Sequence, residues 1–105
     1  MQIDISDEES GQVLKIAGAL DIETASELRK ALSESIEANA GLTLDLGEVD
    51  ACDTAALQVL YSARKTANGA NKPMRILGMS AAVADAAAAL GLAIDELSED
   101  RVSAL

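Results

Sequence analysis

The sequence contains no histidine, tryptophan or phenylalanine, and Tyr61 is its single aromatic residue. Without histidine the chain cannot form a Ser-His-Asp or Cys-His catalytic group, and it cannot form a zinc site with histidine ligands. It also offers few aromatic rings on which bases could stack. The core must therefore consist of leucine, isoleucine, valine and alanine, and we expect no catalytic residues of these classes.

Basic residues are also few, with eight lysines and arginines against eighteen acidic residues and a formal net charge of -10. Lysine and arginine neutralise the phosphates of nucleic acids, and they attract proteins to anionic membrane surfaces. We therefore expect neither nucleic acid nor a membrane as a partner. The single Cys52 cannot form an internal disulfide bond, which fits a reduced, cytoplasmic location. We find no signal peptide and no run of about 18 apolar residues.

No linker, internal repeat or block of charge divides the 105 residues, of which 50% are apolar. This length and composition predict a single domain that spans residues 1–105. The chain contains neither a P-loop nor a Gly-x-Gly-x-x-Gly motif. We therefore predict a protein that is not an enzyme and holds no cofactor or metal.

The hydrophobic pattern predicts two opening strands joined by a polar turn, followed by helices that alternate with strands. Strands are expected at 3–5, 13–17, 42–46 and 74–77, with a last short strand at 92–94. Helices with one apolar face are expected at about 23–39, 54–68 and 80–91. Right-handed crossovers would then give an α/β domain. Its sheet would be mostly parallel, with four or five strands, an N-terminal antiparallel hairpin and helices packed on the sheet, the first two mainly on one side.

The most informative residue is Thr54, because it follows a predicted loop at 50–54 and opens the second predicted helix. One interpretation is that Asp53 or Thr54 caps this helix by accepting a hydrogen bond from an unpaired backbone N–H, which contributes about 1 kcal/mol. The other is that Thr54 accepts a phosphate, which would add a charge of about −1.5 to −2 beside Asp53. A helix N-terminus tolerates such a charge, whereas a partner docked there would not.

Other acidic residues have two interpretations each. Asp21 precedes the first helix, where an aspartate commonly caps the helix but could also contact a partner. Asp45, Asp50 and Asp53 could supply magnesium ligands or a pair of acid–base carboxylates. Nothing in the sequence brings these three together, so we interpret them as solvated acids.

Apolar and basic residues near the second helix also leave alternatives. Leu57 and Tyr61 are four residues apart and could form an exposed patch for a partner or pack at the edge of the sheet. Cys52 is expected to be a small buried residue rather than a redox sensor. Half of the basic charge is expected to form a solvated face, made by Arg64, Lys65, Lys72 and Arg75.

Taken together, several motifs resemble the STAS family, whose members include bacterial anti-sigma factor antagonists. The family pattern of a D-L-x-x-V step followed by D-[S/T]-[S/A]-G-L resembles the segments at 45–49 and 53–57. A G-x-L-D motif followed by T-A-x-x-L stands at 18–21 and 24–28. A strand with a glycine and a serine before a helix stands at 76–80, and a closing Leu-Gly-Leu at 90–92. The order of these motifs matches the family over nearly the whole chain.

The resemblance implies the STAS α/β sandwich and a non-enzymatic switch between proteins. In such antagonists a serine kinase that is also the anti-sigma factor phosphorylates the residue after the aspartate, here Thr54, and a phosphatase resets it. The resemblance also implies a set of partner-binding residues: Asp21, Asp53, Ala55, Ala56 and Leu57. Ala56 replaces the family glycine, which would otherwise permit close approach of a partner.

The family also includes members with other roles. One branch is a small subunit bound to the ATPase of a bacterial lipid transporter, and it too carries threonine after the aspartate. In that alternative Thr54 is a contact and not a kinase substrate. Further members accompany chemotaxis or other signalling systems.

Overall fold

Four strands and three helices make up the computed structural model, which describes residues 1–8 and 11–89. The strands are β1 (Gln2–Glu8), β2 (Gly11–Leu20), β3 (Leu42–Cys52) and β4 (Met74–Met79). The helices are α1 (Ala25–Ala38), α2 (Thr54–Gly69) and α3 (Ala81–Ala89). The predicted strand at 92–94 and the predicted end of the third helix near Gly91 lie outside the described residues.

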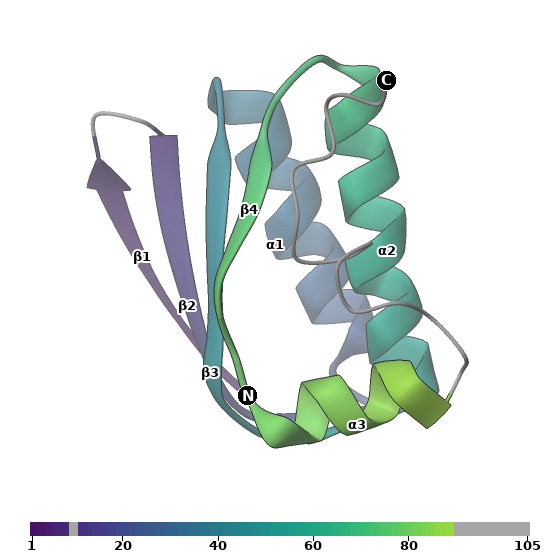
Figure 1. Cartoon of the computed structure of the whole chain (residues 1–105). Coiled ribbons are helices and arrows are strands. Elements are labelled where there is room, and N and C mark those ends of the chain that lie inside the picture. The colour runs from purple at the N-terminus through teal and green to yellow at the C-terminus, as the bar shows by residue number, and fades with distance from the viewer. Residues whose placement is uncertain (9–10, 90–105) are drawn as a thin grey trace.

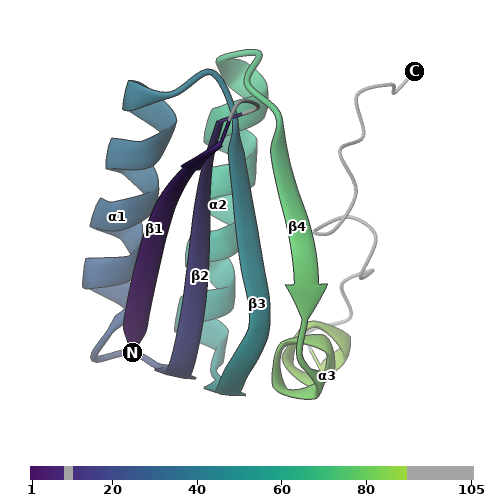
Figure 2. The same ribbon diagram turned by 90° about the vertical axis from the view of Figure 1, so that its left-hand side faces the viewer.

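The sheet has the strand order β1-β2-β3-β4 (Figure 2). β1 and β2 form an antiparallel hairpin, while β2 pairs with β3 and β3 pairs with β4 in parallel. In the last pair Leu42 lies opposite Met74 and Leu44 opposite Ile76. The predicted mostly parallel sheet with an N-terminal hairpin is therefore confirmed.

The helices lie on one face and at one end of this sheet. α1 and α2 cover the same face, while α3 lies across the end of the sheet beyond β4 (Figure 1). α3 also packs against β3. The core fills the layer between the sheet and α1 and α2. The apolar faces expected for the three helices join one buried core through Leu28, Leu32, Ile36, Ala56, Val59, Leu60, Ala63, Ala67, Val83 and Ala87.

The predicted loop at 50–54 is largely wrong, because β3 continues to Cys52 and only Asp53 separates it from α2. β2 is also longer than predicted, and the two extensions pair with each other, Gly18 with Val49 and Leu20 with Cys52. Gly18 has a φ of 93°, which favours glycine, and the register shifts next to it. The buried side chain of Val49 anchors the extension of β3 in the core.

The predicted solvated basic face is wrong for two of its four residues. The side chain of Arg64 is buried in α2, with 4% of its surface exposed. Lys72 is half-buried, and its ammonium donates hydrogen bonds to the backbone carbonyls of Ile36 and Glu37 near the end of α1. A cation at that place also interacts favourably with the helix dipole.

Candidate functional site

The carboxyl ends of β2 and β3 lie at one edge of the sheet, where α1 and α2 begin (Figures 1 and 2). In open α/β sheets this edge is the usual place for binding sites, because the loops after the strands meet there. The loop of residues 21–24 follows β2, and Asp53 and Thr54 follow β3. The structure therefore brings the predicted residues Asp21, Asp53 and Thr54 to one edge.

Asp53 connects the two loops at this edge. One carboxylate oxygen, Oδ1, accepts a hydrogen bond from the backbone N–H of Ala56 at 3.1 Å and so caps α2. The other, Oδ2, accepts a hydrogen bond from the backbone N–H of Ile22 at 3.0 Å. The Asp53 backbone N–H in turn donates to the carbonyl of Leu20 at 3.0 Å. One residue therefore fixes both the start of α2 and the loop between β2 and α1.

Asp21 and Thr24 fix that loop from within. The Asp21 carboxylate accepts hydrogen bonds from the backbone N–H groups of Glu23 and Thr24, at 3.0 and 3.1 Å. The Thr24 hydroxyl accepts a bond from the Asp21 backbone N–H at 3.0 Å. This reciprocal arrangement resembles a capping box and satisfies N–H groups that precede α1. Asp21 therefore holds the turn that leads into α1, but it does not cap α1 as expected, because the N-cap of that helix is Thr24.

Thr54 is the first residue of α2, and its side chain is exposed. The expectation that Asp53 or Thr54 caps this helix is confirmed for Asp53, so Thr54 is not the cap. Within residues 1–8 and 11–89, the Thr54 hydroxyl forms no hydrogen bond. The hydroxyl is therefore open to solvent and to another protein, next to a carboxylate and at the positive end of a helix.

The three residues after Thr54 are directed toward the core. Ala55 is half-buried, whereas Ala56 and Leu57 are each 0% exposed. The exposed patch considered for Leu57 and Tyr61 is therefore wrong, since Leu57 lies in the core and Tyr61 packs partly buried against it. The Ala56 methyl also points inward, so it does not obstruct a partner at the surface. Of the predicted contacts, Asp21, Asp53, Thr54 and Ala55 remain accessible.

The other predicted acids and the cysteine have local roles. Asp45 is half-buried and accepts a hydrogen bond from the Gly47 backbone N–H at 3.0 Å. Among the described residues, no group of three acidic or cysteine side chains is close enough to hold a metal ion. Cys52 is half-buried, and burial together with the charge of Asp53 raises the pKa of its thiol. A raised pKa keeps the thiol protonated and unreactive.

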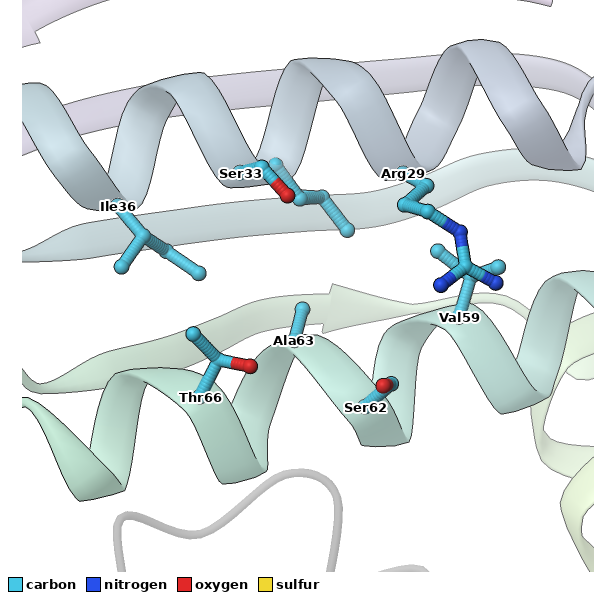
Figure 3. Close-up of a pocket in the computed structure, with 8 residues that line it drawn as sticks. Arg29, Ser33, Ile36, Val59, Ser62, Ala63 and Thr66 are labelled. Carbon is cyan, nitrogen blue, oxygen red and sulfur yellow. The ribbon is translucent and has the colours of Figure 1, made fainter.

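A groove between α1 and α2 is a further candidate site, which no motif in the sequence marks. Arg29 and Ser33 of α1 face Val59, Ser62 and Thr66 of α2 across it (Figure 3). Its volume is about 110 Å³, whereas pockets for small molecules usually measure about 300–1,000 Å³. The groove is therefore smaller than a usual small-molecule pocket.

The double role of Asp53 predicts the effect of removing its side chain. Asp53→Ala should lower the free energy of unfolding by about 1–2 kcal/mol, because the cap of α2 and the bond to Ile22 are lost together. Amide hydrogen exchange at Ile22 should become faster. The matched control is Asp50→Ala, because Asp50 is an exposed neighbour at the end of the same strand. Thermal unfolding measures the stability, and NMR measures the amide exchange. Equal stability and equal exchange at Ile22 in the two variants would contradict the double role of Asp53.

None of the described helices is both long enough and apolar enough to cross a membrane.

The fold resembles several solved structures, two of which are described as anti-sigma factor antagonists. An anti-sigma factor antagonist from Mycobacterium paratuberculosis superposes with a TM-score of 0.78 at 18% identity, over 93% of this chain and 82% of the other. The antagonist SpoIIAA in its unphosphorylated form superposes with a TM-score of 0.71 at 14% identity, over 87% of this chain and 82% of the other. A serine-to-glutamate variant of RsbS from Moorella thermoacetica superposes with a TM-score of 0.74 at 22% identity, over 93% of this chain and 85% of the other. At these identities the likeness shows a shared fold.

Sequence comparison shows the family itself. No curated protein sequence shows significant similarity to the chain. The family profile described as "Mlab, STAS domain" matches residues 2–99, which is nearly the whole chain. The order of strands and helices is the one that the resemblance to STAS domains implied. The chain therefore belongs to the STAS domain family.

Proposed function

We propose that this chain is a non-enzymatic regulatory protein of the anti-sigma factor antagonist type. In its unmodified form it binds a protein kinase that is also an anti-sigma factor, through the edge formed by Asp21, Asp53, Thr54 and Ala55. Phosphorylation of Thr54 by that kinase ends the interaction, and a phosphatase in the cytoplasm restores it. The observation that carries the proposal is the exposed Thr54 hydroxyl beside a cap that Asp53 already provides.

The geometry makes this threonine a suitable kinase substrate. A kinase must reach the hydroxyl, and Thr54 is exposed at the first position of α2. Because Thr54 does not cap the helix, its hydroxyl can be modified without removing a hydrogen bond that holds the fold. A phosphate there would benefit from the helix N-terminus. The fold is therefore expected to tolerate the modification.

The same phosphate would be unfavourable at an interface. It would carry a charge of about −1.5 to −2 next to the Asp53 carboxylate, and both groups would lose water when a partner docks. Burying charge without a matching partner is costly. Phosphorylation should therefore act on binding rather than on folding, as a switch requires.

Similarity to named proteins supports this choice. Two of the similar structures are anti-sigma factor antagonists, and SpoIIAA is described in an unphosphorylated form, which implies that it can be phosphorylated. The RsbS structure carries glutamate in place of a serine. A glutamate supplies a negative charge at such a position, as a phosphate does.

The second candidate is the accessory subunit of a lipid-transporter ATPase. The observation that favours it is the family profile, which carries the name Mlab rather than that of an antagonist. In this case Thr54 is a permanent contact with the ATPase and is not phosphorylated. Both candidates use the same edge of the sheet, so they differ in whether a kinase modifies Thr54.

Phosphorylation in vitro distinguishes the two candidates. The purified chain is incubated with ATP and each anti-sigma kinase of the same genome, and the product is analysed by mass spectrometry. We expect one phosphate on Thr54, none in Thr54→Ala, and normal modification of Thr66→Ala. Thr66 is an exposed threonine of the same helix, about 18 Å further along its axis.

Two results would contradict the proposal. One is the absence of phosphate on Thr54 with every kinase, and the other is modification elsewhere in the chain. Stable co-purification with a transporter ATPase, unchanged in the presence of the kinases, would favour the accessory subunit.

A further inference from the structure

We propose that Ile22 is the apolar anchor of the partner-binding edge, and that it inserts into an apolar pocket ringed by lysine or arginine on the partner protein. This inference rests on the proposed function, since the partner is the same kinase. It adds a contact residue that the family motifs do not mark, because Ile22 lies between the two motifs at 18–21 and 24–28.

Ile22 is unusually exposed for its size. Its side chain is 73% exposed, and only Leu77 and Ile5 are comparable among the large apolar residues that the structure describes, at 71% and 59%. Those two lie on the edge strands β4 and β1. Ile22 alone of the three lies in the loop that carries Asp21 and touches Asp53. A single exposed apolar residue needs no explanation by itself, so the argument depends on how this one is held.

The backbone of Ile22 is fixed on both sides. Its N–H donates to Asp53 Oδ2 at 3.0 Å, and the reciprocal bonds between Asp21 and Thr24 close the loop around it. The chain thus presents an apolar side chain on a backbone that is already ordered. A rigid, preorganised contact loses little conformational entropy on binding, which is the property of an effective anchor.

The surroundings of Ile22 indicate the chemistry of the partner. Asp21 and Glu23 flank it in the sequence, and the Asp53 carboxylate is bonded to its backbone. The first basic residue after it is Arg29, and the whole chain has a net charge of -10. An apolar side chain with acidic neighbours is complementary to an apolar pocket that has lysine or arginine at its rim. Anionic lipid and nucleic acid would be repelled, so the occupant is a protein.

Asp53 joins this anchor to the phosphoacceptor. It holds the Ile22 backbone through one oxygen and directly precedes Thr54 in the chain. Ile22 and Thr54 therefore belong to one surface. On it the apolar contact of Ile22 provides affinity, and phosphorylation of the Thr54 hydroxyl regulates binding. A partner that covers Ile22 must also come close to the position of a phosphate on Thr54.

Calorimetric titration tests the anchor with the anti-sigma kinase that phosphorylates Thr54. We expect Ile22→Ala to weaken binding about 10- to 30-fold, as truncation of an anchor residue does, and Ile22→Asp to weaken it further. Ile22→Met should restore most of the affinity, because it keeps the apolar volume. The matched control is Leu77→Asp, which places the same charge at an equally exposed residue on β4. Its affinity should stay within about threefold of the parent.

The outcomes separate this inference from the proposed function. If the kinase phosphorylates Thr54 and binds Ile22→Asp as tightly as the parent, the anchor is contradicted and the switch stands. If Leu77→Asp weakens binding as much as Ile22→Asp, the specific role of Ile22 is also contradicted. If no kinase binds or modifies the parent chain, both proposals fail. Melting curves of all variants are the control for unfolding, and each variant is expected to melt near the parent.

Discussion

Leu57→Ala is expected to lower the free energy of unfolding by about 2–5 kcal/mol, because it removes a leucine side chain that is 0% exposed. The loss combines the transfer of apolar surface with the cavity left between α2 and the rest of the core. A small domain has a total stability of about 5–15 kcal/mol, so the variant should melt at a clearly lower temperature. Chemical denaturation measures the change.

The control for Leu57→Ala is Leu77→Ala, which makes the same substitution at a side chain that is 71% exposed. Its effect should be within about 0.5 kcal/mol of the parent. A small effect for both variants would mean that Leu57 is accessible at the surface, and the partner contact expected for it from the family motif would regain support.

Thr54→Glu is expected to abolish most of the binding to the partner kinase, whereas Thr54→Ala should bind nearly as well as the parent. Glutamate places one negative charge beside Asp53, and an unpaired charge buried at an interface costs several kcal/mol. A loss of affinity on the order of 100-fold or more follows from that cost. Alanine removes the hydroxyl without adding charge.

Both Thr54 variants should remain folded, because Asp53 holds the cap of α2. Alanine favours a helix more than threonine does, and a negative charge suits the first turn of a helix. We therefore expect stabilities within about 0.5 kcal/mol of the parent. Thr66→Glu is the matched control for charge, since it changes an exposed threonine of the same helix. Equal binding by Thr54→Glu and Thr54→Ala would contradict the switch and favour the accessory subunit.

Local patterns were enough to predict most of the fold. The second helix was expected at 54–68 and is Thr54–Gly69, because its apolar stripe and a pair of candidate caps, Asp53 and Thr54, are visible in the sequence. The parallel direction of the strands at Leu42 and Met74 followed from the alternation of strands and helices.

The missed features depend on contacts between distant parts of the chain. Gly47, Glu48 and Asp50 interrupt the apolar alternation of β3, so its end reads as a loop in the sequence. The extended end of β2 supplies the pairing that keeps it a strand. The bond from Asp53 to Ile22 joins residues that are 31 positions apart, so no local motif reveals it. Burial of Arg64 contradicts the usual exposure of charged residues, which describes a tendency of the residue type and not its place in a fold.

The candidate site was likewise predictable from the sequence only in part. The sequence singled out Asp21, Asp53 and Thr54, and the structure places them at one edge of the sheet. It did not show which residue caps α2, and that detail decides whether the Thr54 hydroxyl is occupied. It also assigned Ala56 and Leu57 to the partner surface from the family motif, although the helix turns both side chains into the core.

Titration of the partner kinase with the chain before and after phosphorylation is the most direct test of the central claim. The account predicts tight binding by the unmodified chain and a loss of about 100-fold or more once Thr54 carries a phosphate. Removal of that phosphate by a phosphatase should restore the original affinity. Equal affinity of the phosphorylated and unphosphorylated chains would contradict the account.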